Sequence, residues 1–142
     1  MSILWKEDTQ NVNWDELSNL YEIAPLGKKD PNELKVVFSA SLYVYFVYDE
    51  DRLVGAGRAL ADGKDCSYIC DVAVAPDYQG RGIGKDIMTK LLESSKNHKK
   101  ILLYSVPGKE EFYAKFGFKH MKTAMAIFED QQQAIQRQLI DL

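Results

Sequence analysis

The most constraining feature of this chain is the stretch from Asp71 to Lys85, which reads DVAVAPDYQGRGIGK. A short apolar strand leads into a Pro-Asp turn, and three glycines at alternate positions, Gly80, Gly82 and Gly84, then open a predicted helix. Such a loop exposes backbone N–H groups that no side chain covers, and the first turn of a helix leaves its own N–H groups without partners. Because the helix dipole adds positive character, these donors predict a binding site for a phosphate or diphosphate group.

Two common phosphate-binding motifs do not fit this loop. A P-loop requires GxxxxGK[ST], but Gly80 and Gly84 stand too close together, and the residue after Lys85 is Asp86, which has no hydroxyl for magnesium. A dinucleotide-binding fingerprint requires GxGxxG early in a repeated βαβ frame. Here the third glycine comes one position too early, and the upstream strands are predicted to form a meander. The loop therefore predicts another kind of anion-binding site.

The pattern Gln79-x-x-Gly82-x-Gly84 follows the strand 72–74 directly and resembles the [QR]-x-x-G-x-[GA] signature of the GNAT superfamily of acyl-CoA-dependent N-acyltransferases. In that family the loop amides hold the diphosphate of coenzyme A, and the preceding strand pairs its backbone with the pantetheine arm. The resemblance thus implies that acetyl-CoA is the cosubstrate. It also implies a set of cofactor-binding residues: Val72, Ala73, Val74, Gln79, Gly80, Arg81, Gly82, Ile83, Gly84 and Lys85.

A second block, EFYAKFGF from Glu111 to Phe118, resembles the F-Y-x-x-x-G-F block of the same family. The two blocks stand in the family's order, with one predicted helix and one predicted strand between them, and the resemblance covers roughly residues 42 to 128. It implies the family's fold, an α/β (α+β) arrangement in which a mixed, mostly antiparallel sheet is flanked by helices on both faces.

The resemblance also implies two catalytic side chains. Tyr113 matches the tyrosine that often protonates the leaving sulfur, and the alternative is a ring that packs against the coenzyme without a chemical role. Asp71 precedes the strand expected beside the thioester, where a carboxylate relays the amine's proton in some members. The alternative for Asp71 is a carboxylate that fixes the local backbone or simply faces solvent. The family carries a bulge in this strand, so backbone N–H groups from Val72 to Val74 are the predicted donors to the oxyanion.

One position departs from the family pattern. Many members place an asparagine just after the strand equivalent to Ile101–Tyr104, where it binds the pantetheine arm, whereas this chain has Ser105 there. The sequence predicts that Ser105 or a backbone group takes that contact, with Phe112 as a further cofactor-binding residue.

Composition limits the remaining possibilities. At 142 residues, with 46% hydrophobic and 27% charged residues, the chain is expected to form a single domain over 1–142 with a C-terminal helix near 130–141. A net charge of −3 argues against nucleic acid as a partner. No apolar run approaches the ~20 residues of a membrane span, so no membrane partner is expected. Without a visible secretion signal, a cytoplasmic location is expected.

No metal site is predicted. Cys66 and Cys70 are the only cysteines, and no histidine lies close to them in the sequence. Zinc sites usually combine four such ligands at short spacings, so both residues are expected to be reduced thiols.

The hydrophobic pattern predicts alternating strands and helices. Asn13 with Glu16 predicts a capping box at one helix start, and Asp30-Pro31 predicts another start. Strands are expected at 2–5, 42–48, 53–60, 67–74 and 101–104, with further strands at 118–121 and 124–128. A helix is expected from Gly82 to about residue 97 and a short one over 110–116, closed by Gly117.

The predicted function is an N-acetyltransferase that moves an acetyl group from acetyl-CoA to a primary amine by direct attack in a ternary complex. Two alternatives remain open: an acetyltransferase acting on protein lysines or N-termini, and a regulatory module that binds acetyl-CoA without transferring it. A weaker resemblance to plant-type serotonin acetyltransferases, with the aromatic strand Tyr43–Tyr48, favours a small arylalkylamine acceptor. The chain is expected to be a monomer or a homodimer.

Overall fold

The computed structural model describes residues 1–142 and divides them into two compact units, Met1–Leu103 and Tyr104–Leu142. The single domain expected over 1–142 stays a prediction. No helix combines the length and the apolar character that crossing a membrane requires.

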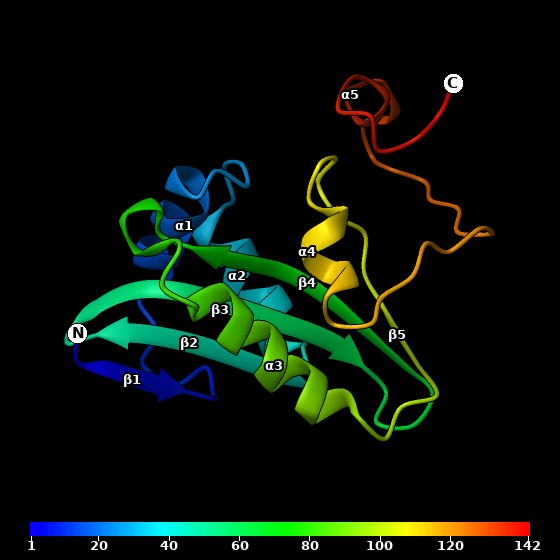
Figure 1. Cartoon of the computed structure of the whole chain (residues 1–142). Helices are drawn as coiled ribbons and strands as arrows, with labels where there is room; N and C mark the ends of the chain where they lie inside the picture. Colours follow the sequence, from blue (N-terminus) through cyan, green and yellow to red (C-terminus); the bar gives the residue numbers. More distant parts are fainter. The chain divides into compact units, whose positions relative to one another are not determined.

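The first unit is built on one five-stranded sheet in the order β1-β2-β3-β4-β5 (Figure 1). Neighbouring strands from β1 to β4 are antiparallel, and β5 runs parallel to β4. This confirms the expected mixed, mostly antiparallel sheet. The strands are β1 (Ile3–Lys6), β2 (Tyr43–Asp49), β3 (Arg52–Ala61), β4 (Cys66–Val74) and β5 (Lys100–Leu102).

Helices flank both faces of this sheet, as expected: α1 (Trp14–Ile23) and α2 (Pro31–Ser39) cover one face, and α3 (Ile83–Ser95) covers the other (Figure 1). On the first face Phe46 packs against Phe38, with ring centroids 5.3 Å apart. On the second face α3 lies close to β3: a Cβ at Gly57 would come within 2.8 Å of Ile87 Cγ2. The absence of a side chain there lets the helix approach the strand.

The caps of the first two helices follow the sequence with one difference. The Asn13 side chain accepts from the Glu16 N–H at 3.1 Å, and Asp30 accepts from two N–H groups of α2, with Pro31 at the first helical position. The predicted capping box is only half formed, however. The Glu16 carboxylate accepts from the Leu53 N–H of β3 at 3.0 Å and thereby ties α1 to the sheet.

The second unit contains α4 (Glu110–Ala114) and α5 (Gln131–Gln136). As expected, Gly117 follows α4, and its N–H donates to Ala114 O at 3.0 Å. The strands predicted at 118–121 and 124–128 were wrong, because the backbone there is irregular. A strand needs a partner to complete its ladder, and the side chains of Met125 and Ile127 are instead 96% and 94% exposed.

The C-terminal helix expected near 130–141 is shorter than predicted and ends at Gln136. Gln138 has a left-handed φ of 61°, its N–H donates to Ile135 O at 2.9 Å, and the Leu139 N–H donates to Ala134 O at 2.9 Å. These two bonds form a Schellman motif, which ends a helix. The sequence did not predict this helix end, because the left-handed residue of such a motif is usually glycine and here it is Gln138.

Candidate functional site

The fourth strand runs well past its neighbour on one side. The parallel pairing of β4 with β5 joins Cys66–Tyr68 to Lys100–Leu102 and then stops, whereas β4 continues to Val74. Beyond Tyr68 the β5 side of β4 therefore lacks a paired strand. An unpaired strand side is compatible with the backbone pairing to a pantetheine arm that the family resemblance implied.

The end of β4 turns its polar groups toward this open side. The Ala75 N–H donates to Val54 O at 2.8 Å, so that position bonds to β3. Because bonding direction alternates along an antiparallel strand, the N–H and C=O of Val74 point away from β3. The Gln79 side chain donates to Val74 O at 3.1 Å, which ties the strand end to the loop that follows.

A bulge interrupts β4 just before this end. Ala56 pairs with Ala73 and Arg58 with Cys70, so β4 has one more residue than β3 between these pairs. Asp71 lies in the bulge with a φ of 57°, in the left-handed region that residues other than glycine rarely adopt. This is the strand in which the family resemblance implied a bulge.

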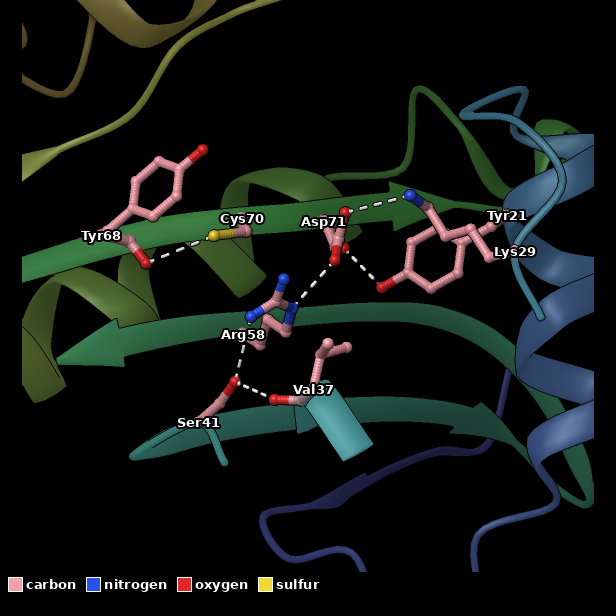
Figure 2. A network of polar contacts seen from close by, with 8 residues as sticks. All are labelled: Tyr21, Lys29, Val37, Ser41, Arg58, Tyr68, Cys70 and Asp71. Atoms are coloured by element: carbon pink, nitrogen blue, oxygen red, sulfur yellow. Dashed lines mark hydrogen bonds and ion pairs between the residues drawn. The ribbon is translucent and has the colours of Figure 1, made fainter. Parts of the chain in front are cut away.

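Asp71 is held by three residues from other elements (Figure 2). Arg58 Nε donates to Asp71 Oδ2 at 2.8 Å, and Lys29 Nζ lies 3.5 Å from Oδ1. The Tyr21 hydroxyl donates to the backbone carbonyl of Asp71 at 2.6 Å. We call Tyr21, Lys29, Arg58 and Asp71 the Asp71 network; it fixes both the carboxylate and the carbonyl of the bulge residue.

Neighbouring Cys70 gives no sign of a nucleophile. Both cysteines are free thiols on β4, in agreement with the sequence. Burial raises the pKa of the Cys70 thiol above its ordinary value, and this outweighs the nearby positive charge of Arg58. The thiol is therefore neutral near pH 7, whereas a nucleophilic cysteine needs its thiolate form.

The loop from Gln79 to Lys85, here called the glycine loop, leaves backbone donors uncovered. After the short 3₁₀ turn η1 (Pro76–Tyr78), Gly80 and Gly82 adopt φ values of 80° and 85°. Gly82 is the N-cap of α3 and makes no side-chain cap bond, and the first intrahelical bond runs from the Asp86 N–H to Gly82 O at 2.9 Å. The amides of residues 83–85 therefore belong to the first turn, which has no intrahelical acceptors.

The space around these amides is open and bordered by positive charge. A Cβ built at Gly80 or Gly82 would meet nothing within 4 Å. The guanidinium of Arg81 lies 4.8 Å from the centre of the Tyr78 ring, and the Lys85 side chain is exposed. The glycine loop thus presents amides, a helix N-terminus and two cations, which together suit a diphosphate group.

Tyr113, predicted as the acid, lies in α4 of the second unit. Its ring makes edge contacts with Phe112 and Phe118, at centroid distances of 5.2 Å and 6.3 Å. Burial raises the pKa of the Tyr113 phenol above its ordinary value. The hydroxyl is therefore protonated at neutral pH, as a proton donor requires.

Ser105 is engaged locally. Its hydroxyl donates to Glu110 Oε1 at 3.2 Å, and the Gly108 N–H donates to the same oxygen at 2.8 Å. These bonds join the segment before α4 to the first turn of that helix. The predicted pantetheine contact of Ser105 stays a prediction.

The structure gathers most of the predicted residues in the first unit: Asp71 and Val72–Val74 on β4, and Gln79–Lys85 in the glycine loop. Ser105, Phe112 and Tyr113 belong to the second unit. Sequence reasoning missed Tyr21, Lys29 and Arg58. No motif marks them, because Tyr21 stands 50 residues and Arg58 13 residues from Asp71 in the chain.

The buried Tyr21 hydroxyl predicts a loss of stability at alkaline pH. Burial, and then the charge of Asp71, raise the pKa of Tyr21 well above 10.0. Unfolded tyrosine releases its proton near pH ~10, so the unfolded state binds fewer protons there and the stability falls as pH rises toward the folded pKa. Urea unfolding between about pH 8 and pH 11 is expected to show a decline that Tyr21→Phe reduces by up to ~1.4 kcal/mol per pH unit. Equal slopes for both proteins would contradict this account.

Comparison with known proteins gives the sequence context. The sequence model described as acetyltransferase (GNAT) family matches residues 6–118. An uncharacterized N-acetyltransferase, ycf52, from Porphyra purpurea is 31% identical over 121 residues, which cover 81% of this chain and 70% of that protein.

Two solved structures show the same fold. A probable acetyltransferase from Staphylococcus aureus has a TM-score of 0.78 at 24% identity and covers 89% of this chain and 99% of its own. Naa50 from Arabidopsis thaliana, solved in complex with the bisubstrate analogue CoA-Ac-MVNAL, has a TM-score of 0.70 at 24% identity and covers 86% of each chain. The family match spans β2 to β5, the glycine loop and Tyr113, and the chain belongs to the acetyltransferase (GNAT) family.

Proposed function

We propose that this acyltransferase moves an acetyl group from acetyl-CoA to a small primary amine by direct attack in a ternary complex. One observation carries the proposal: β4 runs beyond its pairing with β5 and leads directly into the free amides of the glycine loop. An open strand side suits an extended pantetheine arm, and the amides at its end suit a diphosphate. The CoA-containing analogue held by the Arabidopsis protein of the same fold supports this assignment.

The residues present fit the coenzyme both at the end of β4, where the pantetheine arm would lie, and in the glycine loop, where the diphosphate would bind. The N–H of Val74 points to the open side, where it can donate to an amide-bearing arm, and the Val74 carbonyl accepts from the Gln79 side chain. The first-turn amides of α3 and the exposed cations Arg81 and Lys85 belong to the same loop as Gly80 and Gly82, where a Cβ would meet nothing within 4 Å. Acetyl-CoA supplies an acyl thioester, and the protein's part is to bind and orient it.

The transfer makes three demands on the protein. An amine with a pKa near 10 must lose a proton before it attacks, the tetrahedral oxyanion needs fixed donors, and the leaving thiolate needs a proton. Of the backbone N–H groups from Val72 to Val74, that of Val72 in the bulge is the proposed oxyanion donor, and the Tyr113 phenol is the proposed proton donor. The resemblance implied Asp71 as the relay for the amine's proton.

Two measurements test the proposal in sequence. Calorimetry of the folded protein with acetyl-CoA and with free CoA is expected to show heat of binding. No heat of binding with either molecule would contradict the proposal. Release of free thiol is then followed with small arylalkylamines, a lysine peptide and a peptide with a free N-terminus, each against a blank without acceptor. We expect release above the blank with small amines. Release with peptides alone would indicate a protein acetyltransferase, and binding without release would indicate a regulatory module.

A further inference from the structure

The Asp71 bulge is a strained feature that the surrounding structure has to maintain. Asp71 adopts a φ of 57° within β4, where the register between β3 and β4 shifts. A residue other than glycine in this region costs of order 1–3 kcal/mol and persists only where its surroundings fix it. The Asp71 network supplies such surroundings, since it joins the bulge to α1, to the segment between α1 and α2, and to β3 (Figure 2).

The contact from Tyr21 acts on the peptide group that matters for the proposed chemistry. The carbonyl that accepts its hydroxyl belongs to the Asp71–Val72 peptide, and that same planar unit carries the Val72 N–H. The chain contains no cis peptide bond, so the Val72 N–H points opposite to the bound carbonyl. A hydrogen bond to the carbonyl at one edge of this planar unit therefore sets the direction of the N–H at the opposite edge.

This contact is well fixed. Tyr21 is fully buried in α1, and its ring lies 6.4 Å from that of Phe38, so the hydroxyl has little freedom to move. Arg58 is held in turn by α2, because its Nη1 donates to Ser41 Oγ at 3.2 Å and that hydroxyl donates to Val37 O at 2.7 Å. The chain of contacts thus extends from the body of the first unit to the bulge.

Both carboxylate oxygens of Asp71 are already engaged, one by Arg58 and the other by Lys29. The side chain is also only 20% exposed. A carboxylate held by two cations on separate oxygens is arranged to keep its place and is poorly arranged to collect a proton from a passing amine. This geometry favours the backbone-fixing alternative for Asp71 over the proton relay.

We propose that Tyr21, Arg58 and Asp71 are positioning residues that aim the Val72 N–H at the oxyanion formed during acetyl transfer. The inference rests on the proposed function for its catalytic meaning. It assigns Tyr21 and Arg58, which no motif marks, an effect on turnover that acts through the backbone of β4. Lys29 adds a weaker contact to the same carboxylate.

The first test removes a single oxygen atom. Tyr21→Phe deletes the bond to the Asp71 carbonyl, and we expect kcat to fall about tenfold, since losing an oxyanion donor outright costs 10²–10³ and misaiming one costs less. The Kd and KM for acetyl-CoA are expected to change less than about twofold. Tyr45→Phe is the matched control, because it deletes a tyrosine hydroxyl that bonds Ser94 Oγ at 2.5 Å on the α3 face of the sheet.

A second measurement does not depend on turnover. Residual dipolar couplings of the Val72 N–H report the direction of that bond, and we expect Tyr21→Phe to change them while Tyr45→Phe leaves them as in the wild type. An unchanged coupling in Tyr21→Phe, or a kcat no lower than that of the control, would overturn the inference. If the wild type binds acetyl-CoA but acetylates nothing, the proposed function fails, and the dipolar couplings still decide whether Tyr21 sets the amide.

Substitutions of Asp71 separate positioning from proton relay. Asparagine keeps an oxygen for Arg58 and tolerates the left-handed region, whereas alanine loses the contact and is strained there. A positioning role therefore predicts that Asp71→Asn retains about tenfold more kcat than Asp71→Ala. Equal and large losses in both variants would restore the proton relay and overturn the positioning role of Asp71.

Discussion

Replacing Gly82 with alanine is expected to weaken acetyl-CoA binding about a hundredfold. Gly82 has a φ of 85° at the N-cap of α3, and a Cβ there would project into the open space where we place the diphosphate. The methyl group would separate the phosphate oxygens from at least two amides. Hydrogen bonds to a charged group contribute about 1.5–3 kcal/mol each, and ~1.4 kcal/mol corresponds to a tenfold change in Kd. Calorimetric titration with acetyl-CoA measures the effect.

Gly63 offers a matched control for this substitution. It has a φ of 84°, and a Cβ there would also meet nothing within 4 Å, but it lies in the turn between β3 and β4. Both alanine variants should lose about the same stability, ~1–2 kcal/mol, because both force a side chain into the left-handed region. Only Gly82→Ala should lose affinity. Equal affinities in the two variants would remove the glycine loop from the coenzyme site.

Tyr113→Phe is expected to lower kcat about a hundredfold and to leave the KM for acetyl-CoA nearly unchanged. General acid catalysis contributes typically 10²–10⁴-fold, and a thiolate is a fair leaving group, so the lower end applies. Phenylalanine keeps the edge contacts with Phe112 and Phe118 and removes only the proton donor. Steady-state thiol release with saturating amine gives both constants.

The pH dependence of the wild-type enzyme should agree with this role. Because burial raises the pKa of Tyr113, the phenol stays protonated through neutral pH, and loss of the acid should lower the rate only in the alkaline range. Tyr104→Phe is the control in the same unit, where the Tyr104 ring packs edge-on against Phe128 at 5.9 Å. If Tyr113→Phe had the same kcat as this control, Tyr113 would not be the acid, and its ring would only pack against the coenzyme.

The sequence predicted the parts of the structure that local chemistry determines. Gly80 and Gly82 adopt positive φ values that few other residues tolerate. Asn13 and Asp30 mark helix starts, because their side chains accept hydrogen bonds from residues two or three positions away. Each of these signals lies within a few residues of the feature it predicts. The family resemblance joined them into one fold and correctly placed a bulge in β4.

The features that were missed depend on contacts distant in sequence or on the absence of a partner. The residues 118–128 have the composition of strands but find no ladder, and Gln138 ends α5 in a conformation usually signalled by glycine. The Asp71 network is the clearest case, since Tyr21 reaches Asp71 across 50 residues. Neither an aromatic residue in a helix nor an arginine in a strand indicates by itself that it will meet a bulge.

Gly55 and Gly57 of β3, which lie against α3, affect the geometry of the coenzyme site. A Cβ at position 57 would come within 2.8 Å of Ile87, and one at position 55 would be crowded by Ile83 and Ile87, so these two glycines set how near the helix lies to the sheet. The same helix carries the loop amides at its first turn, and their height above the end of β4 is therefore determined by residues that never meet the ligand. A larger residue at either position would shift the loop amides relative to the end of β4, so residues inside the protein can alter the affinity although no binding group is removed.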